Sequence, residues 1–199
     1  YSYSSNEKKG LSNPVVGRTI EDRDGNLWIG TEGGGLNYYN RRTREFKWYR
    51  PQEGRNSISH NNVKALYYDA DKEIIWIGTH LGGLNKLDIR SGHFTHYRME
   101  EGNPNTLPSD IIRDIIPYKS LLIIATQNGV CLFDPANGQC QQLFKDSKEG
   151  KSIKMVADVT FDSEGTLWIA ATGEGVFSYR FDTCRLTNYR HDATNPNSL

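Results

Sequence analysis

The stretch Leu27-Trp28-Ile29-Gly30-Thr31, followed by Gly35-Leu36, recurs along the chain. Its copies are Ile75-Trp76-Ile77-Gly78-Thr79 with Gly83-Leu84, and Leu167-Trp168-Ile169-Ala170-Ala171 with Gly175-Val176. A weaker copy, Ile123-Ile124-Ala125-Thr126 with Gly129-Val130, fills the gap between them, so the Gly-aliphatic pairs are 48, 46 and 46 residues apart. A constant period of this length indicates four repeats of one supersecondary unit.

A second marker repeats in the same phase, as a Ser or Thr followed by an aliphatic residue. Its copies are Ser57-Ile58, Thr106-Leu107, Ser152-Ile153 and Ser198-Leu199, of which three follow an asparagine, namely Asn56, Asn105 and Asn197. The two markers predict units over residues 11–58, 59–107, 108–153 and 154–199, and residues 1–10 as a linker or the end of a preceding unit.

Each unit has the composition of a small antiparallel sheet. In the second unit, the β-rich stretches 63–68, 74–79, 84–88 and 93–98 are separated by short turns rich in Asp, Ser and Gly. No segment has a sustained helical period with capping residues. The sequence therefore predicts an all-β chain built from four-stranded meanders.

A four-stranded sheet of this size cannot bury both faces by itself, whereas sheets packed around an axis bury them against each other. The consecutive apolar residues 74–77 fit a strand that is covered on both faces. We therefore expect a partial β-propeller of four blades over residues 1–199, with Trp28, Trp76 and Trp168 between blades. The sequence leaves open whether these blades form an open arc, a closed four-bladed ring, or two arcs joined in a dimer. The third unit departs from the pattern, because Ile123 replaces the tryptophan.

The overall composition limits the class of partner. Lys and Arg total 24, as do Asp and Glu, which argues against a general electrostatic grip on nucleic acid. No apolar run reaches the length of a membrane-spanning helix. Because both chain ends fall near repeat junctions, we expect a soluble piece of a longer protein, without a membrane segment of its own.

Three cysteines are too few for a disulfide framework, and no pair has the CxxC spacing of a metal or redox site. Cys131 and Cys140 flank the turn 134–138, so they could approach each other across a hairpin. The turn length leaves the register open, and buried free thiols are the favoured interpretation. We expect no metal and no cofactor.

Candidate ligand residues lie in the loops, because positions that a repeat does not fix are where a ligand can act. In the loop between the second and third strands, the chemistry changes from unit to unit, through Glu32, His80, Gln127 and Glu174. The linkers between units add His60 and Asp110. Trp48 has no aromatic counterpart in the other units and is a candidate contact residue.

No catalytic residue is assigned, since the chain has neither a nucleophile elbow nor an HExxH metal motif. Glu32 and Glu174 could in principle form a glycosidase pair, although their spacing cannot be derived from the sequence. The stretch 22–26 lacks the Gly and Glu positions of an EF-hand, so a tight turn is the better interpretation.

Residues 20–40, IEDRDGNLWIGTEGGGLNYYN, with Phe46, Tyr49 and the junction 56–58, resemble the two-component regulator propeller repeat. The resemblance covers nearly the whole chain and is weakest in the third unit. It implies a fragment of a larger, seven-bladed propeller in the periplasmic sensor of a hybrid two-component histidine kinase. Such sensors detect oligosaccharide and control polysaccharide-utilisation genes. The family's motifs are blade scaffolding and transfer no ligand residue.

We therefore expect a noncatalytic sensor module whose propeller domains associate with one another, because uncapped terminal blades leave apolar surface in water. Two alternatives remain. One is a protein-protein interaction propeller that would use Trp48, or the surface formed by 38–39 and 41–42. The other is a propeller glycosidase or lyase, which would need two acids on its loop face.

Overall fold

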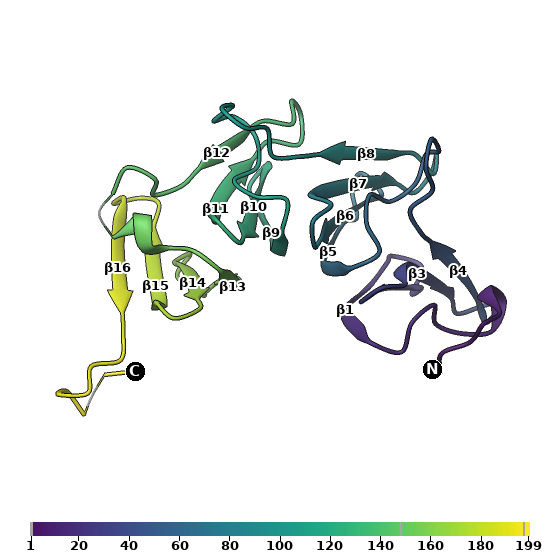
Figure 1. Cartoon of the computed structure of the whole chain (residues 1–199), viewed down its shortest axis with the longest axis horizontal. Coiled ribbons are helices and arrows are strands. Elements are labelled where there is room, and N and C mark those ends of the chain that lie inside the picture. Colours follow the sequence, from purple (N-terminus) through teal and green to yellow (C-terminus); the bar gives the residue numbers. More distant parts are fainter. Residues whose placement is uncertain (1, 148, 197) are drawn as a thin grey trace. The chain divides into compact units, whose positions relative to one another are not determined.

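The computed structural model describes residues 2–147, 149–196 and 198–199. Within them the chain forms four antiparallel sheets of four strands each, and the strands of every sheet follow one another in chain order (Figure 1). Apart from the strands there are two short 3-10 helices. The all-β class and the four meanders are confirmed, whereas Asn197 of the second marker lies outside the described residues.

The chain divides into two compact units, Tyr1–Arg98 with Asp110–Ile115, and Met99–Ser109 with Ile116–Leu199. The first two sheets belong to the first unit. Their strands are β1 (Val16–Glu21), β2 (Leu27–Thr31), β3 (Gly35–Asn40) and β4 (Glu45–Tyr49), then β5 (Val63–Asp69), β6 (Ile74–Thr79), β7 (Leu84–Asp88) and β8 (Phe94–Tyr97). The helix η1 (Glu7–Lys9) precedes them.

The remaining two sheets follow the same order. Their strands are β9 (Ile112–Tyr118), β10 (Leu121–Thr126), β11 (Gly129–Phe133) and β12 (Cys140–Gln142), then β13 (Val156–Phe161), β14 (Leu167–Ala171), β15 (Gly175–Arg180) and β16 (Arg185–Tyr189). The helix η2 (Gly150–Ser152) lies between them in sequence. Each predicted unit range contains one sheet, and the bounds of those ranges stay a prediction.

The core of each unit forms where two successive sheets meet. In the first unit, Trp28 and Leu36 of the first sheet pack in one cluster with residues of and around the second, which are Ile58, Val63, Leu66, Ile75, Ile77, Leu87 and Phe94. Trp28 is 2% exposed and Trp76 is 1% exposed. In the second unit, Ile123 and Val130 pack with residues of the fourth sheet, among them Val159, Ile169 and Phe177.

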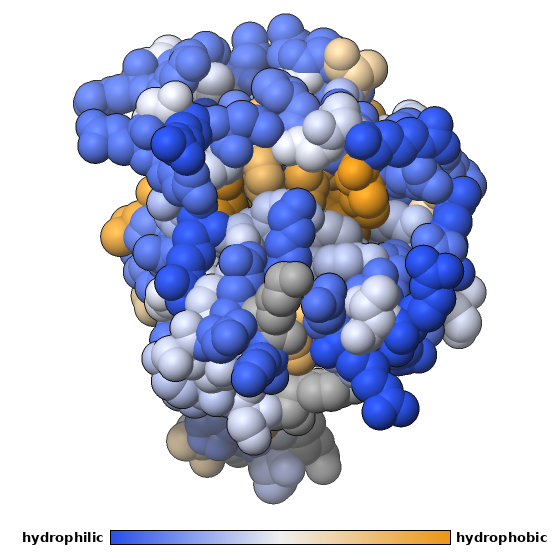
Figure 2. All heavy atoms as spheres, turned by 90° about the vertical axis from the view of Figure 1, so that its right-hand side faces the viewer, coloured by the Kyte–Doolittle hydropathy of each residue, from blue (hydrophilic) through white to orange (hydrophobic). Residues whose placement is uncertain are grey.

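Apolar groups are not confined to the interior. On the face drawn in Figure 2, orange apolar groups come to the surface and hydrophilic groups surround them. Exposed apolar residues include Val15 and Val16 at the start of β1, Leu81, and Tyr189 at the end of β16.

The Gly-aliphatic marker has a steric origin. Gly35 has a φ of +80°, and a Cβ placed on it would collide with the carbonyl oxygen of Tyr49 in the outer strand. Gly83 and Gly175 have φ values of +68° and +85°, with the same collision against the carbonyls of Tyr97 and Tyr189. A glycine is needed because the chain enters the third strand in a left-handed conformation while the fourth strand closes on it.

Replacing Gly35 by alanine should therefore destabilise the chain by at least about 3 kcal/mol, because backbone strain and a backbone collision add. Gly54→Ala is the matched control: its φ is also positive, at +67°, but nothing lies within 4 Å of the added Cβ. That control should cost only about 1 kcal/mol. Urea unfolding followed by tryptophan fluorescence measures both, and equal losses would contradict the steric explanation.

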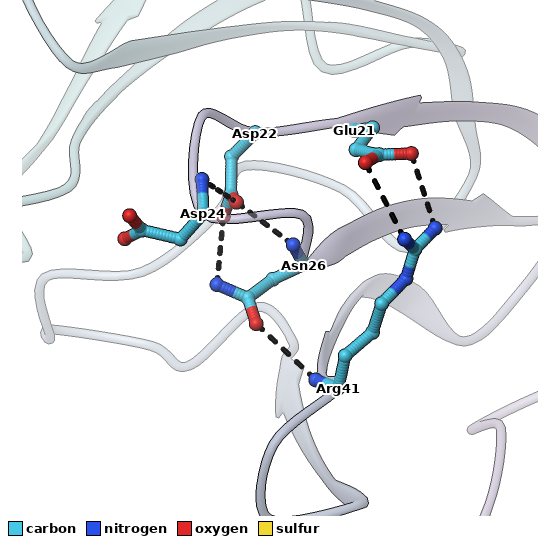
Figure 3. A network of polar contacts seen from close by, with 5 residues as sticks. All are labelled: Glu21, Asp22, Asp24, Asn26 and Arg41. Carbon is cyan, nitrogen blue, oxygen red and sulfur yellow. Dashed lines mark hydrogen bonds and ion pairs between the residues drawn. The ribbon is translucent and has the colours of Figure 1, made fainter.

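The turn between the first and second strands is organised by one aspartate (Figure 3). Asp22 Oδ1 accepts hydrogen bonds from the backbone N–H groups of Asp24 at 3.0 Å and Asn26 at 2.9 Å. Beside the turn, Arg41 pairs with the Glu21 carboxylate. This geometry agrees with the tight-turn interpretation of residues 22–26.

The aspartate of this turn also anchors the tryptophan in the first and fourth sheets. Trp28 Nε1 donates to Asp22 Oδ2 at 3.1 Å, and in the fourth sheet Trp168 Nε1 donates to Asp162 Oδ2 at 2.8 Å. The bond from Trp168 is the main reason that the pKa of Asp162 lies below its ordinary value. A buried indole N–H needs such a partner.

A tyrosine of the outer strand lies beside each of these tryptophans. The ring centroids are 5.8 Å apart for Trp28–Tyr49, 6.0 Å for Trp76–Tyr97 and 5.6 Å for Trp168–Tyr189. The repeat therefore fixes both an indole and its aromatic neighbour.

The favoured interpretation of Cys131 and Cys140 as free thiols is wrong. They form a disulfide bond, with Cα atoms 6.0 Å apart. Cys131 faces Gln142 and Cys140 faces Phe133 across the β11–β12 pair, so the two cysteines are diagonal neighbours on one face of the hairpin. The register, which the sequence left open, decides the pairing. Cys184 is exposed and free.

Thiol counting tests this assignment. The oxidised, denatured chain should react with one equivalent of a thiol reagent at Cys184, and the reduced chain with three equivalents. Cys184→Ser should lower the first count to zero. Reducing the disulfide should cost about 2–3 kcal/mol of stability, the loop-closure entropy of a ring of this size. Three reactive thiols before reduction would exclude the bond.

Candidate ligand site on the loops of the first unit

A linker brings two strand-end loops together in the first unit. Glu32, in the loop between β2 and β3, forms an isolated antiparallel bridge with Asn62 of the linker that enters β5. The Asn62 carbonyl accepts the N–H of His80, which lies in the loop between β6 and β7. Gly35 donates its N–H to the Asn61 carbonyl at 2.7 Å. The linker is therefore pinned between the loops that carry Glu32 and His80.

Lys64 joins this group because β5 begins with an irregularity. The register of the β5–β6 pair shifts between Val63 and Ala65, which leaves Lys64 unpaired in the ladder. Its ammonium group forms an ion pair with the Glu32 carboxylate. The hydrogen bond from Lys64 and then its charge hold the pKa of Glu32 below its ordinary value. Glu32 is thus an ionised hydrogen-bond acceptor.

The two histidines differ in their bonding. His60 Nδ1 accepts the backbone N–H of Asn62 at 3.1 Å, which leaves Nε2 as the protonated donor of the neutral ring. Burial, and then the charges of His80 and Arg98, lower the pKa of His60. His60 therefore presents one N–H at neutral pH.

Two polar atoms of this group are buried without a partner. Among the described residues, His80 Nδ1 and Asn61 Oδ1 make no hydrogen bond and have almost no accessible surface. Leaving a buried polar atom unpaired costs about 1–3 kcal/mol. A native structure keeps few such atoms, and a bound polar molecule is one reason to keep them.

An ion pair between an arginine and an aspartate is bonded to the loop that carries His80. Arg98 donates to Asp110 Oδ2 at 3.1 Å and to the Leu81 carbonyl at 2.7 Å. The Asp110 carbonyl accepts the N–H of Gly83 at 2.9 Å. Leu81 itself is 56% exposed.

Four of the six ligand candidates predicted from the sequence therefore lie on neighbouring loops of the first unit: Glu32, His60, His80 and Asp110. Gln127 and Glu174 lie in the second unit, where the Gln127 carbonyl accepts the N–H of Met155 and Glu174 pairs with Arg190. Sequence reasoning pointed to the linker that holds Asn61 but missed Lys64 and Arg98. No signal marked them, because a register shift and a linker path place them.

Trp48 packs on the rim of the first sheet. Its Nε1 donates to the Gly10 carbonyl at 2.9 Å, and its backbone N–H donates to Glu7 at 2.7 Å. The Arg50 guanidinium lies 4.6 Å from the ring centroid. The indole is half-buried beneath the segment before β1, and its role as a contact residue stays a prediction.

Two features of the described part of the chain bear on the kind of site. No group of three or more His, Cys, Asp or Glu side chains is placed to hold a metal ion. No helix is long and apolar enough to cross a membrane.

Two stretches of the chain match a known family. Residues 10–33 and 57–80 match the two component regulator propeller. These segments contain the first two strands of the first and second sheets, and the match agrees with the resemblance seen in the sequence. No curated protein matches the chain.

Solved structures show the same fold. The extracellular domain of BT3049 from B. thetaiotaomicron, titled a hybrid two component system, is similar to 92% of the chain with a TM-score of 0.82 and 24% identity. The extracellular domain of BT4673 from the same organism is similar to 96%, with a TM-score of 0.76 and 22% identity. The chain spans 25% and 26% of these two chains. The four sheets are thus propeller blades.

Removing the Lys64 ammonium tests the electrostatics of the site. In Lys64→Met the pKa of Glu32 should rise towards its ordinary value, because its hydrogen bond and its nearest positive charge are lost. NMR-detected titration of the carboxyl carbon measures the shift. The stability gap between the two proteins should be present above the ordinary pKa of Glu32 and close as the pH falls through the lowered one. Lys154→Met, an exposed control, should leave Glu32 unchanged.

Proposed function

We propose that the chain is part of a noncatalytic sensor module in the extracytoplasmic, periplasmic portion of a hybrid two-component histidine kinase. Its ligand is an oligosaccharide, and its output is control of polysaccharide-utilisation genes. The match to the two component regulator propeller and the similarity to the extracellular domain of a hybrid two component system support the class. The Cys131–Cys140 disulfide supports an oxidising compartment outside the cytoplasm, because such bonds are rare in reducing ones.

The observation that carries the ligand proposal is the meeting of Glu32, a partly exposed carboxylate, with His60 and His80 on neighbouring loops of the first unit. These loops present an ionised carboxylate at Glu32 and a neutral imidazole at His60. A sugar hydroxyl donates and accepts hydrogen bonds at once, so it can pair with both the Glu32 acceptor and the His60 Nε2 donor. The Lys64–Glu32 and Arg98–Asp110 ion pairs balance the local charge, which favours a neutral ligand.

The electrostatics support a binding role over a glycosidase. A catalytic acid in such an enzyme needs a raised pKa so that it holds its proton near neutral pH. The pKa of Glu32 is lowered instead, and Glu174 pairs with Arg190. Ion-paired carboxylates accept hydrogen bonds from a ligand without donating a proton to it.

We further propose that the blades belong to a larger propeller. Trp28 is buried by the sheet that follows it, whereas the equivalent Trp168 is only partly buried and its neighbour Tyr189 is 43% exposed. A further repeat packed on the fourth sheet would cover both rings as the second sheet covers Trp28. The chain's span of about a quarter of the similar structures agrees with this arrangement.

Calorimetric titration with a panel of neutral oligosaccharides tests the binding proposal. We expect one binder, and Glu32→Ala and His60→Ala should each weaken it about tenfold, the value of one or two hydrogen bonds. Gln141→Ala, an exposed change in the second unit, should leave the affinity unchanged. A panel without a binder would refute the ligand class, and release of cleaved sugar would refute the noncatalytic role.

A further inference from the structure

The outer strand of each of the first three sheets is covered by the segment that precedes that sheet. In β4, the N–H of Trp48 donates to Glu7 at 2.7 Å. In β8, the N–H of Phe94 donates to Asn56 Oδ1 at 2.7 Å, and Asn56 Nδ2 donates to the Gly92 carbonyl at 2.9 Å. In β12, the N–H of Cys140 donates to the Asn105 carbonyl at 2.8 Å.

These contacts explain the asparagine of the second sequence marker. Asn56 uses its side-chain amide as a substitute for a neighbouring strand, and Asn105 uses its backbone carbonyl. Both occupy outward-pointing groups of an edge strand, which would otherwise be free to pair with another chain.

Among the described residues, the fourth sheet lacks this cover. Lys151 holds the sequence position that Asn56 and Asn105 hold before the second and third sheets. The linker folds on itself through hydrogen bonds of Ser147 to Phe144 and Gly150. The Phe144 ring packs against Tyr179 at 4.6 Å between centroids. In the described linker, residues 143–147 and 149–155, no hydrogen bond reaches β16.

The register identifies which groups of β16 point outward. Asn188 faces Phe177, as Trp48 faces Asn37 in the first sheet, and the Trp48 N–H points away from its sheet. The Tyr189 carbonyl lies on the inner side, against Gly175. Alternation along the strand then directs the backbone groups of Leu186 and Asn188 outward. Asn188 Oδ1 is also buried without a partner.

We propose that β16 pairs edge to edge with β16 of a second copy of this chain, antiparallel and centred on Thr187. Leu186 and Asn188 would then exchange backbone hydrogen bonds with Asn188 and Leu186 of the other copy. The strand is self-complementary in charge, because its single charged residue, Arg185, comes to lie across from Tyr189. Neither like charges nor a proline oppose the pairing.

The assembly is closed, because the outer edges of both β16 strands are occupied once the two copies have paired. It predicts a dimer and no larger assembly. The surface lies on the outer strand of the fourth sheet and does not depend on an oligosaccharide, so its test and the calorimetric test can fail independently.

Sedimentation equilibrium of the chain tests the assembly. We expect a monomer–dimer equilibrium, and Asn188→Pro should weaken it at least about tenfold, because the outward N–H is lost and the ring blocks approach. Thermal unfolding checks that Asn188→Pro still folds. Leu186→Lys places a charge on the same edge and should act in the same direction. A chain that stays monomeric, or forms larger oligomers, overturns the proposal.

Cysteine cross-linking tests the register in a Cys184→Ser background. Thr187 would face Thr187 of the other copy as a non-hydrogen-bonded pair with Cα atoms about 4.5 Å apart, within reach of a disulfide. Thr187→Cys should therefore yield a covalent dimer on mild oxidation. Asn188→Cys is the matched control, since its partners would be diagonal and too far apart to bridge. Equal cross-linking at both positions, or none at Thr187→Cys, refutes this pairing.

Discussion

Burial of one sheet's face by the next is the interaction that sustains the structure. A four-stranded sheet in a repeat of about 46 residues has two faces, and the repeat has too few residues to cover either face by itself. Trp28 of the first sheet is buried among side chains of the second, including Val63 and Ile77. Its indole N–H donates to Asp22. The glycine at the start of each third strand then lets the outer strand close.

This packing makes the strands rigid and leaves the loops as the variable part. Thr31 and Thr79 tie their loops to the backbone through bonds to the carbonyls of Gly35 and Gly83, each 2.9 Å long. Glu32 and His80, the next residue in each loop, are released from the repeat pattern and meet across the linker. The candidate site is thus a product of fixed strand ends and free loop tips.

The third sheet shows how one position can serve different structural needs. In the first two sheets, the side-chain oxygen of a buried asparagine accepts the backbone N–H of a linker serine. Asn37 accepts from Ser12 and Asn85 from Ser59, each at 2.8 Å. In the third sheet, Cys131 holds this position, two residues after the repeated glycine, and bonds to Cys140 of the outer strand. In this sheet, which also lacks the tryptophan, a disulfide within the hairpin stands in place of a hydrogen bond to the linker segment.

The sequence by itself determined the repeat, the strands and the buried role of Trp28, because these follow from local periodicity and from residue types that recur in phase. It also placed the candidate residues on loops. Tertiary structure decided which of them meet, since Lys64 and Asn61 take their positions from a register shift and a linker path. It decided the Cys131–Cys140 bond for the same reason: pairing across a hairpin depends on register, which a single sequence leaves open.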